Sequence, residues 1–257
     1  MINFNNSKFF SKPFVHCVFE EIFLEKDYNS LVENFPSLDQ MEKMYDPKGE
    51  NKFNKFQLSS RNHSKKFNKV MMKNKFYKKV TDYLLSDFFL ENLVNNLKKQ
   101  NIEFGVTFRK NSYKRKFFDV IKNFLPGFIL KPKEVLNVVV EFSAIPSNQG
   151  YLKPHSDGPA KLASIVIPIR DEKWKDEYNG GTNLLEPRDE KRVFNVKNNT
   201  LEFEETKIIK VIDFKKNQML IFPKTFNSLH SVGPLKGLDK NYYRKSLTLN
   251  LEKKIII

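Results

Sequence analysis

The pattern of apolar and polar residues changes near residue 134 of the chain. In the first half, apolar residues recur at helical spacing over residues 25–35 and 65–100, which predicts one helix and then one or two more. A short apolar run at residues 13–19 predicts a strand. We therefore expect this half of the chain to be mainly helical.

The second half of the chain is patterned as short strands. Its apolar runs are rich in β-branched residues or alternate with polar residues, and turn-forming residues separate them. Several such strands at close spacing are typical of a sandwich or barrel rather than of a parallel sheet with crossover helices. The expected strands are residues 135–142, 161–169, 200–205, 207–214, 218–223 and 244–251.

No repeat of 20 to 50 residues and no low-complexity linker separates the two halves. We therefore expect a single domain over residues 1–257. Residues 113–131 are both basic and apolar, which suits a membrane-surface or partner-binding helix. Because apolar stripes usually belong to a core, an insertion whose apolar side packs on the strands is the favoured interpretation.

Composition places the chain among globular proteins. With 257 residues, 40% hydrophobic and 14% aromatic, it is long enough for one substantial core. No apolar run approaches the roughly 20 residues that span a bilayer, and the first residues lack a signal-peptide pattern. A single cysteine, Cys17, excludes an internal disulfide and suits a reducing compartment. We expect a cytoplasmic location.

The formal net charge of +15 raises the question of an anionic partner. Only seven of the 45 basic residues are Arg, and the Lys residues are spread along the chain. Base reading and bidentate phosphate binding favour Arg. A solvated Lys surface is therefore the favoured interpretation, while nucleic acid or another acidic partner stays open.

A candidate metal site lies at His155 and Asp157. On an extended segment, residues i and i+2 point to the same side, so both side chains can face one point. A His and an Asp make a poor catalytic pair without a nucleophile, but they are good metal ligands. His230 follows another expected strand, and two His with one carboxylate form the facial triad of non-haem Fe(II) oxygenases. Zinc hydrolases use similar ligands, so these residue types alone do not choose the metal.

The last expected strand carries polar residues on one face. Arg244, Ser246, Thr248 and Asn250 alternate with three leucines. An Arg that points into a barrel is costly without a partner, and the carboxylate of a ligand would resolve that cost through a bidentate pair. An internal Glu, or water at the strand end, would do so as well.

Four segments together resemble the 2-oxoglutarate- and Fe(II)-dependent dioxygenases, with the prolyl-hydroxylase-like branch as the nearest match. They occur in the order and spacing of that family, and the resemblance covers roughly residues 135–251. The segments are His155-x-Asp157, GGTNLLEP at 180–187, NQMLIFPKTFNSLHSV at 217–232 and RKSLTLNL at 244–251.

The resemblance implies an α+β fold whose core is a double-stranded β-helix, or jelly roll, over residues 134–252. Residues 1–133 would supply supporting helices and an insertion. It also implies that His155, Asp157 and His230 hold Fe(II), and that Arg244, helped by Ser246, binds the distal carboxylate of the cosubstrate 2-oxoglutarate. O₂ would be the second cosubstrate.

Two further points follow from the resemblance. Tyr151 would add a hydroxyl to the 2-oxoglutarate site. Many prolyl hydroxylases have a Lys where this chain has Arg244, and the Arg-x-Ser form belongs to other branches of the family. This departure leaves the identity of the substrate open.

The expected activity is hydroxylation of an unactivated C–H bond, with release of succinate and CO₂. We expect a small-molecule or glycan-type substrate, and desaturation or epimerisation also fits the pattern. Two other classes stay open at this point. One is a cupin-like metal-binding jelly roll that does not use 2-oxoglutarate, and the other is a basic protein that binds nucleic acid or an anionic surface.

Overall fold

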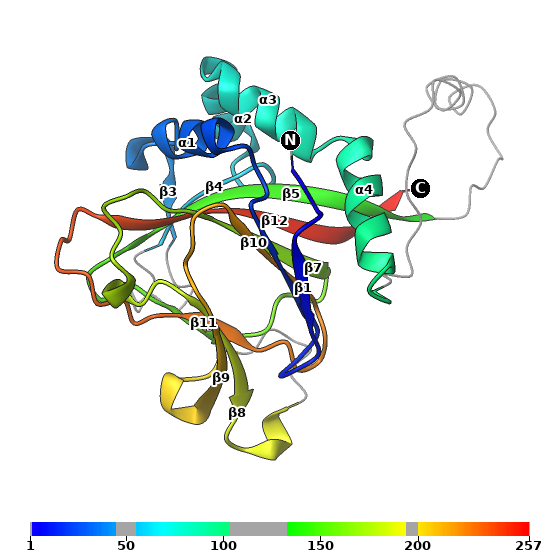
Figure 1. Ribbon diagram of the computed structural model, residues 1–257, viewed down its shortest axis with the longest axis vertical. Helices are drawn as coiled ribbons and strands as arrows, with labels where there is room; N and C mark the ends of the chain where they lie inside the picture. Colours follow the sequence, from blue (N-terminus) through cyan, green and yellow to red (C-terminus); the bar gives the residue numbers. More distant parts are fainter. Residues whose placement is uncertain (1, 45–54, 103–132, 194–199, 257) are drawn as a thin grey trace.

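Two β-sheets face each other, and helices cover the outer face of the larger one (Figure 1). The computed structural model describes residues 2–44, 55–102, 133–193 and 200–256. The basic and apolar segment at 113–131 lies outside these residues. None of the described helices is long and apolar enough to cross a membrane.

The larger sheet has eight strands in the order β1-β2-β10-β7-β12-β5-β4-β3. Every neighbouring pair in it is antiparallel. Its strands are β1 (Ser7–Phe10), β2 (His16–Glu20), β3 (Glu42–Lys43), β4 (Phe56–Ser59), β5 (Lys133–Pro146), β7 (Lys161–Ile169), β10 (Gln218–Pro223) and β12 (Tyr243–Ile256).

The smaller sheet has four antiparallel strands in the order β6-β11-β8-β9. Strands β5 to β12 divide between the sheets so that β5, β12, β7 and β10 face β6, β11, β8 and β9. This order is that of a double-stranded β-helix, so the predicted fold is confirmed. The four strands are β6 (Leu152–His155), β8 (Thr182–Pro187), β9 (Thr206–Ile212) and β11 (His230–Val232).

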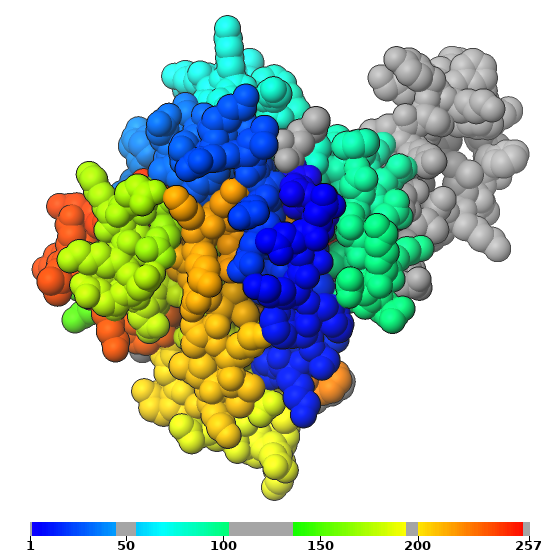
Figure 2. Space-filling view, viewed as in Figure 1, coloured from blue at the N-terminus to red at the C-terminus, as the bar shows by residue number. Residues whose placement is uncertain are grey.

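The first half of the chain contributes strands as well as helices. Strands β1 and β2 extend one edge of the larger sheet, and β3 and β4 extend the other. In the space-filling view, the N-terminal segment lies beside the segment that contains β10 (Figure 2), in agreement with the pairing of β2 with β10. Only the strand at residues 13–19 was expected, because the other three are two to four residues long.

Residues 65–100 form three helices rather than one or two. They break at Asn74 and Ser86, whose side chains accept hydrogen bonds from the backbone N–H groups of Tyr77 and Phe89. Such N-caps satisfy the first turn of a new helix. The four helices are α1 (Glu25–Glu33), α2 (Ser64–Lys73), α3 (Lys75–Leu84) and α4 (Asp87–Lys98).

The prediction of a strand at residues 200–205 was wrong. Residues Phe203–Glu205 form a 3-10 turn, and Glu202 and Glu205 close it with a capping box. Acidic side chains that bind their own backbone favour such a turn over a sheet ladder. Thr200 alone keeps a strand-like contact, a bridge to His155.

The helices bury the outer face of the larger sheet. Leu247, Leu249 and Leu251 of β12 are fully buried within the same apolar cluster as the helices, and each such leucine stabilises the fold by about 2 kcal/mol. The ring of Tyr77 on α3 packs edge-on against Phe142 of β5, with centroids 4.9 Å apart. Because side chains alternate along a strand, the residues between these leucines point into the space between the sheets.

Candidate functional site

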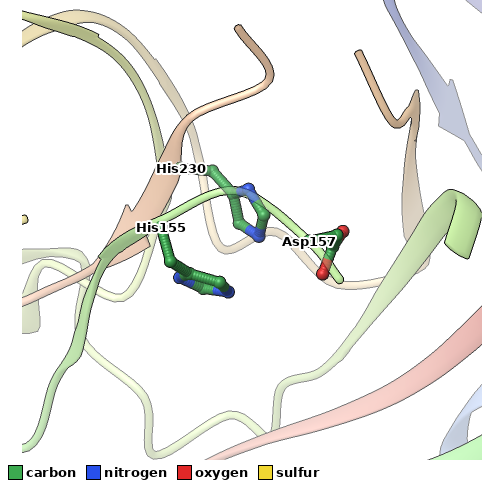
Figure 3. Close-up of side chains that lie close together, drawn as sticks. All are labelled: His155, Asp157 and His230. Carbon is green, nitrogen blue, oxygen red and sulfur yellow. The ribbon is translucent and has the colours of Figure 1, made fainter. Parts of the chain in front are cut away.

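Three metal-binding side chains come together at one end of the smaller sheet. His155 ends β6 and His230 begins β11, and the two are register partners across the antiparallel pair. Asp157 follows two residues after His155. One ligand atom from each side chain lies within 4.8 Å of the others, and the three groups point toward one another (Figure 3). The structure therefore brings together the three residues that the sequence singled out.

Both imidazole rings are oriented by backbone carbonyl groups. The Nδ1 atom of His155 lies 2.8 Å from the carbonyl oxygen of Lys153, and that of His230 lies 3.0 Å from the carbonyl oxygen of Ser228. A carbonyl only accepts, so each Nδ1 carries the proton. This arrangement leaves the lone pair of each Nε2 for a metal ion.

The electrostatic surroundings keep both rings neutral. Burial lowers the pKa of His155 to about 3, and the adjacent His230 acts in the same direction. Burial likewise lowers the pKa of His230 below its ordinary value. Neutral imidazole is the form that binds metal ions.

Asp157 is buried and ionised. Its Oδ1 accepts a hydrogen bond of 2.6 Å from Lys161 Nζ, and its Oδ2 accepts one of 2.6 Å from Ser164 Oγ. Burial alone would raise the pKa of Asp157, but the adjacent Lys161 acts against this through its charge and its hydrogen bond, and the pKa lies below its usual range. Two neutral imidazoles and one carboxylate form a donor set that fits Fe(II) and other divalent transition metals.

Arg244 of β12 lies at the same cavity with its side chain buried, only 3% exposed. Its Nε donates a 2.6 Å hydrogen bond to the carbonyl oxygen of Gly180, and its guanidinium lies 4.7 Å above the ring of Phe214. Burial lowers its pKa to about 10, so it stays protonated at neutral pH. Among the described residues no Asp or Glu pairs with it. A buried cation in this position calls for an anionic ligand.

Ser246 and Tyr151, the other two predicted 2-oxoglutarate contacts, differ in position. Ser246 lines the cavity, and its Oγ lies 2.9 Å from Ser143 Oγ. Tyr151 is not among the described residues that line the cavity, and its ring packs against Phe203 with centroids 5.9 Å apart. A cosubstrate contact through Tyr151 therefore stays a prediction.

The cavity has a volume of about 300 Å³ and extends well beyond the three metal-binding residues. Part of its lining is apolar and includes Val166 and Phe222. Another part of its lining is a set of polar side chains that sequence analysis did not single out. We call this set the polar wall: Lys55, Gln57, Arg61 and Glu141.

A sequence signal exists for one member of the polar wall. Glu141 is the one charged residue within the apolar run at 135–146, and a charge in such a run is unusual for a buried strand. Lys55, Gln57 and Arg61 carry no such signal, because they lie in a polar and irregular stretch.

The chain was compared with known proteins. No family model and no curated protein matches it. Among solved structures, a prolyl hydroxylase from Trichoplax adhaerens, in complex with a hypoxia inducible factor peptide fragment, is 12% identical with a TM-score of 0.47. That match covers 92% of this chain and 83% of the other.

Two other similar structures are prolyl 4-hydroxylases. The one from Phytophthora capsici is 14% identical with a TM-score of 0.49, and the match covers 92% of this chain and 58% of that chain. The one from Pseudomonas putida is 10% identical with a TM-score of 0.45, and the match covers 93% and 92% of the two chains. These matches report a likeness of fold.

Proposed function

We propose that the protein is an Fe(II)- and 2-oxoglutarate-dependent dioxygenase. The observation that carries this proposal is the presence, in one cavity, of a His-Asp-His cluster with an ionised carboxylate and of a buried Arg without an acidic partner among the described residues. The first is a donor set for Fe(II), and the second is an anchor for a carboxylate.

In this proposal His155, Asp157 and His230 hold the metal ion. When bound, Fe(II) together with 2-oxoglutarate and O₂ supplies an oxidant for an unactivated C–H bond, with succinate and CO₂ as products. Two neutral imidazoles and one carboxylate leave a divalent ion with one net positive charge, which suits a dianionic cosubstrate.

The remaining roles belong to the walls of the cavity. The guanidinium of Arg244, helped by Ser246, binds the distal carboxylate of 2-oxoglutarate. Gly180 and Phe214 fix the direction of that guanidinium, through a hydrogen bond to its Nε and a contact with its face. Val166 and Phe222 exclude water from the apolar part of the cavity.

The finer proposal concerns the reaction. We propose hydroxylation of a C–H bond in a small-molecule or glycan-type substrate. A cavity of about 300 Å³ is at the lower end of the range for small-molecule sites, and 2-oxoglutarate takes part of that space.

The direct test is succinate release from 2-oxoglutarate in the presence of Fe(II) and O₂. We expect the wild-type protein to release succinate only when Fe(II) is added, and the His155→Ala variant to release none above background. The matched control is His63→Ala, since His63 does not line the cavity. Succinate release by the His155→Ala variant at the wild-type rate would overturn the proposal. A metal-binding protein that never turns over 2-oxoglutarate would instead indicate the cupin-like class.

A further inference from the structure

The polar wall is a built structure rather than a loose surface. Glu141 of β5 is buried, 8% exposed, and its Oε1 accepts a 2.7 Å hydrogen bond from Lys55 Nζ while its Oε2 accepts one from Gln57 Nε2. Burial alone would raise the pKa of Glu141, but the adjacent Lys55 outweighs it and holds the pKa below its usual value. Glu141 is therefore an anion that orients Lys55 and Gln57 at the cavity.

Such a wall is costly for a fold to maintain. A buried ion pair contributes little net stability, because the cost of removing both charges from water offsets their attraction. Neither Glu141 nor Lys55 has a role in the metal site or in binding 2-oxoglutarate. Their place in the lining of the cavity therefore points to a role in binding a ligand.

Arg61 belongs to the same wall and is more open to solvent. Its Nη1 donates to Glu252 of β12, and its side chain is 53% exposed. A guanidinium has five N–H donors, and Glu252 takes only part of this set. Arg61 thus adds a positive charge to the same cavity lining as the more buried Lys55, at a position that solvent can reach.

The charges of the cavity do not balance. Its described lining contains four cationic side chains (Lys55, Arg61, Lys161 and Arg244) and two anionic ones (Glu141 and Asp157). Because Fe(II) and the 2-oxoglutarate dianion cancel, two positive charges remain in the loaded site. Glu252 pairs with Arg61 without lining the cavity, and one positive charge remains even when it is counted. A cavity of this sign attracts anions.

Resting on the proposed function, we propose that the substrate is a small polar molecule that bears an oxyanion, either a phosphate or a carboxylate, and that Lys55 and Arg61 bind this group. The rest of the substrate lies against uncharged polar side chains. Gln57, Thr248 and Asn250 line the same cavity and supply donors and acceptors for hydroxyl or amide groups.

The test uses inorganic phosphate and ¹³C-labelled acetate as probes. The full chain is loaded without oxygen with 2-oxoglutarate and substoichiometric Mn(II), a paramagnetic substitute for Fe(II). Relaxation of the ³¹P or ¹³C nucleus is then measured, since a nucleus bound in the same cavity as Mn(II) relaxes faster. The probe with the larger effect distinguishes a phosphate from a carboxylate substrate.

We expect the enhancement to be about tenfold smaller in the Lys55→Met and Arg61→Met variants, as for loss of a charged hydrogen bond. The Lys55→Arg variant keeps the charge and retains the enhancement. The Lys8→Met control removes the same charge from β1, outside the cavity, and also retains it. Unchanged Mn(II) and 2-oxoglutarate affinities show that the variants are folded.

Three results would overturn the inference. An enhancement that persists in both Met variants would place the anion on the metal ion itself. No enhancement with either probe, in protein that binds Mn(II) and 2-oxoglutarate, would refute the anion subsite and leave the proposed function standing. Protein that binds neither Mn(II) nor 2-oxoglutarate would refute the proposed function, and this inference with it.

Discussion

His155 and His230 face each other across the antiparallel pair of β6 and β11, with ring centroids 4.4 Å apart. In each case Nδ1 is bonded to the carbonyl of the residue two positions earlier in the chain. The smaller sheet therefore sets both the position and the tautomer of two rings through backbone groups alone. Such pre-orientation lowers the cost of binding a metal ion.

Removing either ring is expected to abolish metal binding. Loss of a group that merely orients a ligand typically weakens metal affinity by about 10- to 100-fold, so His155→Ala and His230→Ala should each lose more than this. Calorimetric titration with Mn(II) under anaerobic conditions measures the effect. If either variant binds Mn(II) as tightly as wild type does, His155 and His230 are not the ligands.

Two residues that contact Asp157 offer variants with opposite expected effects on Mn(II) affinity. Lys161→Met removes a positive charge that contacts Asp157 Oδ1, so we expect tighter Mn(II) binding, on the order of tenfold, since like charges repel. Ser164→Ala removes a hydrogen bond that orients Oδ2, so we expect weaker binding, again about tenfold.

The control for this pair is Lys175→Met, which removes an exposed charge outside the cavity. Its Mn(II) affinity should match that of the wild type. Equal shifts in the same direction for Lys161→Met and Ser164→Ala would show that the metal ion does not use Asp157.

A variant of Arg244 should distinguish the affinity for the cosubstrate from the affinity for the metal ion. The Arg244→Leu variant is expected to keep its Mn(II) affinity and to lose 2-oxoglutarate affinity by on the order of 100-fold, because two charged hydrogen bonds are lost. Titration of the Mn(II)-loaded variant with 2-oxoglutarate measures this loss. The exposed Arg188 provides the control as Arg188→Leu. If the Arg244→Leu variant binds 2-oxoglutarate as tightly as the wild type does, Arg244 does not bind the distal carboxylate.

His16 gives a prediction on stability that does not involve the metal site. It is fully buried in β2, and burial lowers its pKa below the ordinary value of 6.5. The unfolded chain therefore takes up a proton near pH 6.5 that the folded chain resists. The free energy of unfolding should fall as the pH drops below 6.5, with each such His contributing up to about 1.4 kcal/mol per pH unit.

Urea unfolding between pH 7.5 and pH 5 tests this prediction. His16→Gln removes the titrating group, so its free energy of unfolding should fall less steeply than that of the wild type. The other histidines titrate alike in both proteins, so the difference in slope belongs to His16. Parallel pH profiles would show that His16 is protonated as readily in the folded chain as in the unfolded one.

The strand pattern of the sequence predicts a sandwich or barrel, while the resemblance to a known family implies the jelly roll and a shared site for His230, His155 and Asp157. Alternation along residues 244–251 places the leucines on the helix side and Arg244 on the cavity side. His155 and Asp157 share a side because they are two residues apart on an extended segment. In each case the spacing carries the information. The roles of these residues in binding iron and 2-oxoglutarate stay predictions.

Apart from the unusual charge of Glu141 in an apolar run, the polar wall could not be predicted, because tertiary contacts create it. Gln57 and Glu141 are 84 residues apart in the chain, and they meet because β4 pairs with β5. Strand β4 is short, and it joins the larger sheet near its edge. The wrong prediction of a strand at 200–205 has a local cause instead of a tertiary one, since a capping box overrides the alternating pattern there.

The hydrogen bond between Arg244 and the carbonyl of Gly180 spans 64 residues. A methyl group on Gly180 would lie 2.4 Å from the ring of Trp174, so a side chain there would shift this carbonyl and with it the aim of the guanidinium. A substitution in this turn, although it lies far from the metal-binding residues in the sequence, would therefore change the affinity for the cosubstrate. Screening for altered dependence on cosubstrate concentration should return variants at this turn as well as at the anchor itself.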